Sequence, residues 1–313
     1  MSAGVLGLGI VAPGARGCAA WARALRAAAP VDFKVLDLGD TADPKERRLP
    51  RLDRMALSAA REALGDHGTE GLGLVFGTGY GGLTATVDFL EGLAERGMAF
   101  GSPSAFHQSV HHAPAGQVSI ALGIRGPCLT TSSRELSGES ALQVGLGLLR
   151  TGRATKVLVV AADELTSTLE AGFRAFGSTW RAGEGAAAVL LGADPAAVGV
   201  EHCELTSHST GTLRLIDDAA ALTPALEVAA RKAGERPLVS ASGWGATEQA
   251  VLRQLVPSGQ ALTTADRLGA NPSGGLLRLV AAALELSGGG PRAALLHGLS
   301  MGGGQATVVL RRR

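Results

Sequence analysis

Glu135 stands where an extended stretch of the chain turns into an apolar helix. The stretch 126–132 has a strand pattern, and the apolar positions from Leu136 to Leu149 repeat with a helical period. Such a corner lifts one side chain clear of the sheet and directs it at the helix N-terminus, where negative charge is favoured. Enzymes present nucleophiles at corners of this kind. Here the presented group is a carboxylate, which could serve as a general base or proton donor.

Histidines cluster just upstream of this corner. Three of the seven, His107, His111 and His112, lie within six residues. Neighbouring histidines point apart on a helix, and no nearby cysteine or carboxylate completes a tetrahedral ligand set. We therefore expect no metal site. We expect a helix to start near residue 113, with His111 and His112 satisfying backbone groups or lining a contact surface.

Three glycine-containing segments could also carry chemistry. The cluster 77–82 lacks the G-x-G-x-x-G spacing and the later acidic residue of a dinucleotide loop, which favours a structural turn. Glu184 lies between two glycines, which is typical of a carboxylate that accepts backbone N–H groups, although a catalytic acid is the alternative. The segment 297–306, with Ser300 and Met301, is predicted to be a glycine-rich loop. No helix follows it, so it lacks the phosphate-binding mechanism of a P-loop.

The elements that must position these residues alternate between strand and helix in two halves. In the first half we predict strands at 5–11, 72–76, 126–132, 157–161 and 185–191, and helices at 17–28, 51–64, 113–122 and 136–149. In the second half we predict strands at 238–241, 293–296 and 306–310, and helices at 247–255 and 276–286. The stretch 195–237 is hard to interpret. The alternation predicts a layered α/β fold, with units 1–194 and 195–313 packed as one compact body.

Composition narrows the classes of function. The 313 residues include 29 Lys and Arg against 28 Asp and Glu, a net charge of +1 without a basic block, so nucleic-acid or membrane-surface binding has little electrostatic support. No segment has the length and composition of a signal peptide or membrane span. Three widely spaced cysteines fit a reducing, cytoplasmic setting without a metal site. We expect no cofactor.

Taken in order, several segments resemble landmarks of the β-ketoacyl synthases. They are GLGIVAPGA, RLDRMALSAAREAL, VFGTGYGG, VHHAPAGQVSIALGIRGPCLTTSS, GEGAAAVLL and HGLSMGGGQATVVL. Together they cover nearly the whole chain. The resemblance implies an α/β thiolase-like fold of five layers, built from two pseudo-symmetric halves and usually assembled as a dimer.

That family's chemistry requires an elbow cysteine, which holds the acyl chain, and two histidines, which assist decarboxylation. The resemblance places the cysteine position at Glu135 and the first histidine position at Ser242. In the segment 263–271, Ala265 stands near the family's lysine, and Ala270 or Asn271 stands near the second histidine. Every catalytic position that can be aligned therefore carries a different residue.

Replacement of the cysteine removes the family's nucleophile. A carboxylate is a poor partner for thioester exchange compared with a thiolate. Without imidazoles there is no evident donor set for an enolate oxyanion. Cys128 precedes the corner by seven residues, and we expect it to be an ordinary buried cysteine.

The resemblance therefore implies a non-condensing subunit of the chain-length-factor type. Such a subunit pairs with an active ketosynthase that works with an acyl carrier protein in polyketide, polyene or fatty-acid-like biosynthesis. The SVHHAPAG segment is similar to the S-V-H-N-A-P-A-G of short chain-length-factor-like proteins, with His112 in place of asparagine. We expect Glu135 to fill the vestigial pocket or to bond across the interface. His111, His112, Ser300 and Met301 are predicted pocket or interface residues.

Two alternatives remain open from the sequence. One is a decarboxylase of malonyl carrier protein that uses Glu135 as base or proton donor, with a pKa raised by burial. The other is a scaffold that binds an acyl chain or carrier protein without chemistry. In either case a homodimer or a heterodimer is expected.

Overall fold

The structure is a computed structural model. It describes residues 3–26, 38, 44–175, 182–211, 214–262, 264, 268–269 and 271–313. Ala265 and Ala270, two of the positions aligned above, lie outside these ranges.

Five strands of the first half of the sequence lie next to one another in the described sheet. They are β1 (Ala3–Ala12), β3 (Leu72–Gly77), β4 (Cys128–Thr131), β5 (Lys156–Asp163) and β6 (Gly185–Gly192). Their spatial order is β4-β3-β5-β6-β1, and the short β2 (Ala15–Arg16) pairs with β1. β3 is parallel to both β4 and β5, whereas β6 runs antiparallel between β5 and β1. β4 is thus the outermost strand of this half.

The second half repeats the same spatial order. Its strands are β7 (Val198–Ser207), β8 (Leu238–Ser240), β9 (Gln260–Ala261), β10 (Ala293–Ser300) and β11 (Gly304–Arg312). They lie in the order β7-β11-β10-β8-β9, so the third strand is again outermost and the first is innermost. The halves join where β1 pairs with β7 at Ala3↔Val200 and Gly4↔Gly199. The repeat confirms the predicted two-half α/β fold. The division into 1–194 and 195–313, packed as one compact body, stays a prediction.

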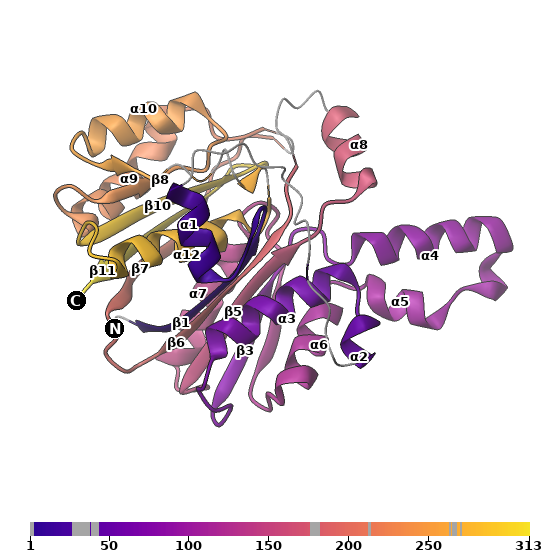
Figure 1. Cartoon of the computed structure of the whole chain (residues 1–313). Helices are drawn as coiled ribbons and strands as arrows, with labels where there is room; N and C mark the ends of the chain where they lie inside the picture. Colours follow the sequence, from indigo (N-terminus) through magenta and orange to yellow (C-terminus); the bar gives the residue numbers. More distant parts are fainter. Residues whose placement is uncertain are drawn as a thin grey trace.

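Helices complete five layers (Figure 1). Helices α3 (Arg51–Leu64) and α6 (Ala113–Leu122) cover the outer face of the first five strands. Helices α9 (Ala219–Ala233) and α10 (Ala246–Leu255) cover the outer side of the second five. Helices α7 (Ser137–Arg150) and α12 (Gly274–Ser287) pack against each other between the two sets of strands. The shorter helices α1 (Cys18–Arg26) and α2 (Pro44–Arg47) lie on the N-terminal side of α3 in the sequence.

The apolar core follows these layers. One cluster, with Leu142 and Leu277, fills the space around the central helices. A second, with Met55 and Phe76, lies under α3, and a third, with Leu222, lies under α9. Strands β5 and β6 are buried on both faces, which explains their unbroken apolar sequences.

Small residues let α3 lie very close to β1. A Cβ atom on Gly7 would stand 2.0 Å from the carbonyl oxygen of Ala63, and one on Gly9 would stand 2.0 Å from that of Ala59. Neither position could hold a side chain without moving the helix away. The glycines of β1 and the alanines of α3 thus allow the helix and strand backbones to approach each other closely.

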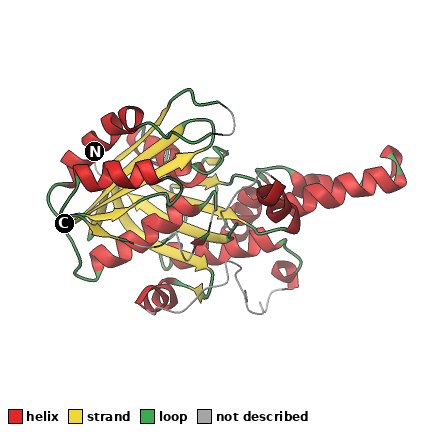
Figure 2. Ribbon diagram, turned by 90° about the horizontal axis from the view of Figure 1, so that it is seen from above, coloured by secondary structure: helices red, strands yellow, loops and turns green. Residues whose placement is uncertain are grey.

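A helical arm projects from the body. It consists of α4 (Leu83–Arg96), the 3₁₀ turn η1 (Met98–Phe100) and α5 (Pro103–Ser109), and Figures 1 and 2 show it extending away from the layers. The rings of Phe89 and Phe106 pack 5.5 Å apart and hold its two helices together. Helix α8 (Ser167–Ala175) stands near the arm's base (Figure 1).

The sequence interpretation missed several elements and misjudged one loop. α4, α5, α8, β7 and α9 were not predicted. The segment 297–306 is largely strand: β10 runs to Ser300, β11 starts at Gly304, and the turn Met301–Gly303 uses positive φ at Gly302 and Gly303. The prediction of a loop over 297–306 was therefore wrong, because only residues 301–303 lie between the two strands. No helix among the described residues has the length and apolarity to span a bilayer.

Candidate functional site

The predicted corner between strand and helix is present. β4 ends at Thr131 and α7 begins at Ser137. Between them Arg134 adopts a left-handed φ of 51°, which is uncommon for a residue with a side chain. The Ser137 hydroxyl stabilises the turn by donating to the Arg134 carbonyl at 2.6 Å and accepting from the Ser133 N–H at 3.0 Å.

Glu135 is directed at the turn between the last two strands. Its side chain is buried, and Oε2 accepts a hydrogen bond from the backbone N–H of Met301 at 3.2 Å. The neighbouring Arg134 donates from Nη1 to the carbonyl oxygen of Met301 at 3.4 Å. Glu135 and Arg134 thus bind the N–H and the carbonyl oxygen of Met301, respectively.

Burial dominates the electrostatics of Glu135. Desolvation raises the pKa of its carboxyl group above the usual value. The backbone N–H groups of Glu135 and Met301 and the charge of Arg134 oppose this effect without cancelling it. The group is therefore better suited to hold a proton than an exposed glutamate would be.

Ser242 lies in a buried polar network rather than facing an open cavity. Its hydroxyl donates to Oε2 of Glu248 at 2.5 Å, and its N–H donates to Oε1 of Glu248 at 2.8 Å. The same hydroxyl accepts from the Trp244 N–H at 3.1 Å. Its hydrogen-bonding capacity is therefore used within the protein.

His297 extends this network across the sheet. Its Nδ1 lies 2.6 Å from Oε1 of Glu248, and both side chains are fully buried. Its Nε2 lies 3.3 Å from Oε1 of Gln305, whose Nε2 donates to the Ala221 carbonyl at 3.2 Å. Both ring nitrogens thus face acceptors. Burial acts to raise the pKa of Glu248, but the hydrogen bonds and charge of His297 and the Ser242 donors hold it below the usual value.

A buried ion pair links this network to the elbow helix. Nη2 of Arg278 lies 3.1 Å from Oε1 of Glu139, one helical turn after Glu135, and also donates to the His297 carbonyl at 3.4 Å. A Cβ atom at Gly275 would stand 1.9 Å from the Glu139 carboxyl carbon, so glycine there leaves room for the acid. Sequence reasoning missed Glu139, Glu248 and Arg278. The available signal was the charge of Arg278 among the apolar residues of 276–284.

Asn271 is linked through Ser273 to the buried carboxylate of Asp163. Its Oδ1 accepts from the Ser273 N–H at 2.8 Å, and the Ser273 hydroxyl donates to Asp163 at 2.7 Å. Asp163 also accepts from the Thr78 hydroxyl at 2.8 Å and from the Gly79 N–H at 2.9 Å. Desolvation raises the pKa of Asp163 to about 6 against the effect of these donors. Nδ2 of Asn271 is buried without a hydrogen-bond partner in the described part of the chain.

The Asn271 segment lies beside the elbow. A Cβ on Gly79 would stand 2.5 Å from Cβ of Pro272 and 3.2 Å from the carbonyl oxygen of Arg134. Residues 79, 134 and 272, from three separate parts of the sequence, therefore meet at one point. The structure thus brings Glu135, Met301 and the Asn271 segment to the same region, whereas the bonded partner of Ser242 is Glu248.

The other predicted positions have different surroundings. His111 and His112 are exposed at the start of α6, without a resolved capping bond from His112, and Ser300 donates its hydroxyl to the Met301 carbonyl at 3.1 Å. Glu184 accepts from the Leu165 N–H at 3.2 Å and pairs with Arg51, as predicted for a structural carboxylate. Among the residues that the structure describes, no group of three or more His, Cys, Asp or Glu is placed to hold a metal ion.

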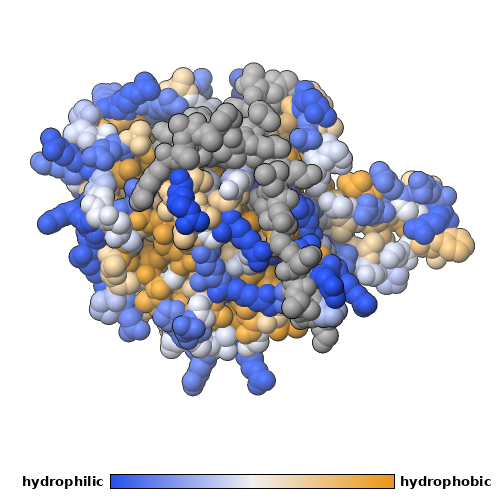
Figure 3. Space-filling view, in the orientation of Figure 1, coloured by the Kyte–Doolittle hydropathy of each residue, from blue (hydrophilic) through white to orange (hydrophobic). Residues whose placement is uncertain are grey.

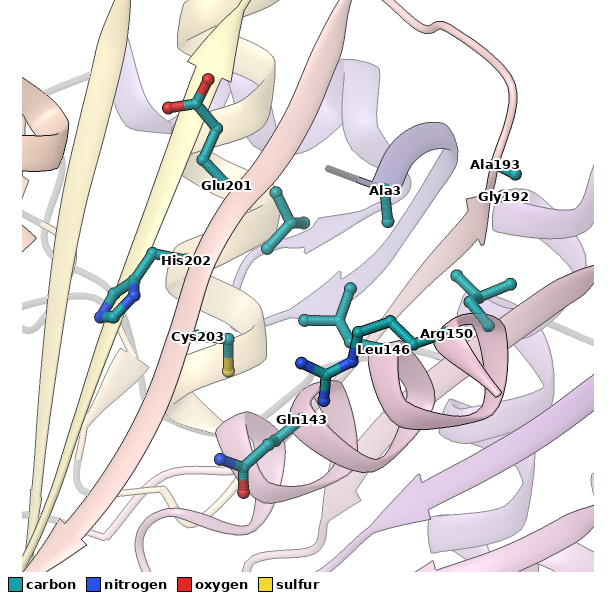
Figure 4. Close-up of a pocket in the computed structure, with 11 residues that line it drawn as sticks. Ala3, Gln143, Leu146, Arg150, Gly192, Ala193, Glu201, His202 and Cys203 are labelled. Atoms are coloured by element: carbon teal, nitrogen blue, oxygen red, sulfur yellow. The ribbon is translucent and has the colours of Figure 1, made fainter. Parts of the chain in front are cut away.

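The cysteines do not supply a substitute thiolate. Burial raises the pKa of the Cys18 and Cys203 thiols to about 12, with nearby Glu62 and Glu139, respectively, adding to the effect. Partial desolvation also raises the pKa of Cys128. Cys128 is exposed, so the prediction of a buried side chain was wrong. Figure 4 shows Cys203 beside a cavity of about 130 Å³, with Gln143 and Arg150 projecting from α7.

The chain has relatives by sequence. The β-ketoacyl synthase N-terminal domain family matches residues 19–215. Two 3-oxoacyl-(acyl-carrier-protein) synthase 2 proteins from Staphylococcus aureus are 28% identical over 153 residues, which is 46% of this chain and 37% of theirs. The match therefore spans little more than a third of these curated relatives.

Solved structures share the fold over the whole chain. The ishigamide ketosynthase/chain length factor has a TM-score of 0.86 at 23% identity, covering 100% of this chain and 99% of that one. The ketosynthase ApeO in complex with its chain length factor ApeC, from Xenorhabdus doucetiae, has a TM-score of 0.81 at 17% identity, covering 100% and 98%. These similarities show the thiolase-like fold of the ketosynthases. Since the family match covers more than half of the sequence, the chain belongs to the β-ketoacyl synthase family.

Proposed function

We propose that this protein is a non-condensing subunit of the chain-length-factor type that pairs with an active ketosynthase. The observation that carries the proposal is the hydrogen bond between Glu135 and the Met301 N–H at the elbow. The position that holds a nucleophile in the family carries an acid, and that acid accepts from a backbone donor. A donor used in this way does not stabilise the oxyanion of a reacting thioester.

The surroundings support the same proposal. Thioester exchange needs a thiolate at neutral pH, and the three cysteine thiols have raised pKa values. Ser242, at the first histidine position, is hydrogen-bonded to Glu248. A hydroxyl that donates to a buried carboxylate contributes to stability instead of stabilising an enolate.

One surface has the character of a subunit interface. The large apolar side chains that are most exposed in the described residues all come from the consecutive elements α4 to β4: Leu90, Met98, Phe100, Phe106, Ile120 and Leu129. Figure 3 shows hydrophobic surface among hydrophilic residues on the arm. Among the described strands β4 pairs only with β3, so its other edge presents backbone donors and acceptors.

The relatives suggest what would cover this surface. One solved structure of the same fold is a ketosynthase with its chain length factor, and another, of 15% identity and TM-score 0.82, is a type II polyketide acyl-carrier protein in complex with its ketosynthase. By analogy, we propose a ketosynthase as the direct partner of this chain. The acyl carrier protein would then be a partner of the assembled pair.

Co-expression with candidate ketosynthases tests the pairing. We expect a stable heterodimer in size-exclusion chromatography coupled to light scattering. We also expect the pair to extend an acyl chain with malonyl carrier protein as the source of the added unit. The chain alone should show no condensation. A chain that remains monomeric and binds no ketosynthase at about micromolar concentration would contradict the proposal.

One observation favours a second candidate, decarboxylation of malonyl carrier protein. The raised pKa of Glu135 suits it to protonate an enolate. The bond between the carboxylate and C2 of the malonyl group would break to release CO₂, and the enolate carbon would take the Glu135 proton to leave acetyl carrier protein. Mass spectrometry of the carrier protein detects this product. A turnover unchanged in Glu135→Ala would exclude Glu135 as the donor.

A further inference from the structure

A cavity of about 510 Å³ lies where the arm meets the body. Residues from α3, from the start of α4, from α5 and from the segment after β5 line it. Its volume lies within the range typical of small-molecule sites. No step of the function proposed above uses this cavity.

Two buried carboxylates face this cavity. Asp53 from α3 is only 4% exposed and lines the cavity wall. Glu164, which directly follows β5, is 6% exposed and accepts from the N–H of Thr84 at 3.2 Å and from its hydroxyl at 2.8 Å. In the described part of the chain, no hydrogen-bond donor meets the carboxylate of Asp53.

An unpartnered buried carboxylate is costly, since it gives up hydration without receiving a donor. Arg51, a basic residue of the same helix that lines the cavity, donates through Nε and Nη2 to Glu184 at 3.1 and 2.6 Å. Arg48 also lines the cavity, but its side chain is exposed. The charge of Arg51 also acts on Glu164. Asp53, in contrast, faces the charge of Glu164 and receives no hydrogen-bond donor from the described residues, and a positively charged ligand would supply one.

We propose that this cavity binds the ammonium group of a small organic amine between the carboxylates of Asp53 and Glu164. An ammonium group carries three donors and one charge, which matches the two carboxylates and leaves a third donor for another acceptor or for water. A bare divalent ion fits less well, because it takes six or more oxygen ligands at short distances. In the described residues no third acidic side chain joins these two in such an arrangement.

Isothermal titration calorimetry with butylamine tests the proposal, with butanol as the neutral ligand of similar shape. We expect butylamine to bind, butanol not to bind, and affinity to fall at least about tenfold in Asp53→Asn and in Glu164→Gln. Glu170→Gln is the matched control, since this exposed acid on α8 lies outside the cavity. Its affinity should stay within about twofold of the parent chain.

Three results would overturn the proposal. They are absence of butylamine binding at about 10 mM, an equal loss of affinity in Glu170→Gln, and Mg²⁺ binding that displaces the amine. Circular dichroism of each variant separates lost binding from lost folding. Residues of this chain line the cavity, so the measurement is made on the full chain alone, and its failure leaves the proposed pairing with a ketosynthase untouched.

Discussion

The backbone N–H of Met301 donates to Oε2 of Glu135 at 3.2 Å, although the two residues are 166 positions apart. This bond joins the elbow of the first half to the final hairpin of the second. It gives the elbow acid a structural role that an amide could share, because an amide oxygen also accepts hydrogen bonds.

Replacement of Glu135 should therefore depend on the acceptor. We expect Glu135→Gln to unfold in urea within about 0.5 kcal/mol of the parent chain, and Glu135→Ala to lose about 1–2 kcal/mol, because alanine leaves the Met301 N–H without its partner. Equal losses in both variants would show that the bond adds nothing to stability.

Breaking the buried pair of Glu248 and His297 should be more costly. We expect His297→Ala to reduce the free energy of unfolding by about 3 kcal/mol, because it leaves the buried Glu248 carboxylate without its His297 partner. Since folding lowers the pKa of Glu248, its contribution is present above the usual glutamate pKa and is lost as pH falls through the folded value. Urea melts at several acidic pH values measure this dependence. Ser242→Ala is the milder comparison, with a loss of about 1 kcal/mol.

Asp53 should make the protein less stable as pH rises. Desolvation, followed by the charge of Glu164, raises its pKa to about 7. Arg51, Arg48 and Asp88 are the other charged groups around the same cavity. Between the ordinary carboxyl pKa, about 4, and about 7, the folded state holds more protons, so unfolding free energy falls with rising pH.

Asp53→Asn should weaken this dependence, with the part due to Asp163 remaining, and raise Tm by several degrees at about pH 8, where the parent chain carries the buried charge. Differential scanning calorimetry across this range measures it without added amine. A parent Tm that is constant from about pH 4 to 8 would contradict the raised pKa. Asp53→Asn is thus expected to lose amine binding while gaining stability.

The exposed apolar residues near β4 should matter for assembly and little for folding. Ile120 is 78% exposed and Leu129 is 42% exposed. We expect Ile120→Lys and Leu129→Lys to weaken binding to a ketosynthase by about tenfold or more, because each places a charge in a buried apolar contact. Gln254→Lys, an exposed position on α10, is the control. Surface plasmon resonance compares the ketosynthase affinities of the three variants. Equal affinities would show that Ile120 and Leu129 do not belong to the interface.

Periodic, buried segments of this chain were predictable from sequence. α3 was predicted at its observed bounds because Leu52, Met55 and Ala59 alternate with polar residues at a helical spacing. α4 was missed, since Gly92 is its one buried residue within the described range and it makes few core contacts. A helix that packs mainly on a neighbouring helix shows little of the periodic pattern.

The candidate site was predictable only in part. The corner at Glu135 is a local feature, set by a strand and helix adjacent in sequence. The network beyond Ser242 and Glu248 is not local: His297 reaches Glu248 across 49 residues, and Arg278 reaches Glu139 across 139. Such contacts follow from how the two halves stack, which the spacing of residues within one segment does not encode.

The repeated strand order leaves the sheet with two ends of unequal length. In the part of the chain that the structure describes, β4 offers the four residues Cys128–Thr131, whereas β9, at the opposite end, comprises the two residues Gln260–Ala261. A short terminal strand is a poor template for further pairing. Growth by edge-to-edge addition would therefore stop after one step, so the architecture favours a closed pair over an open-ended filament.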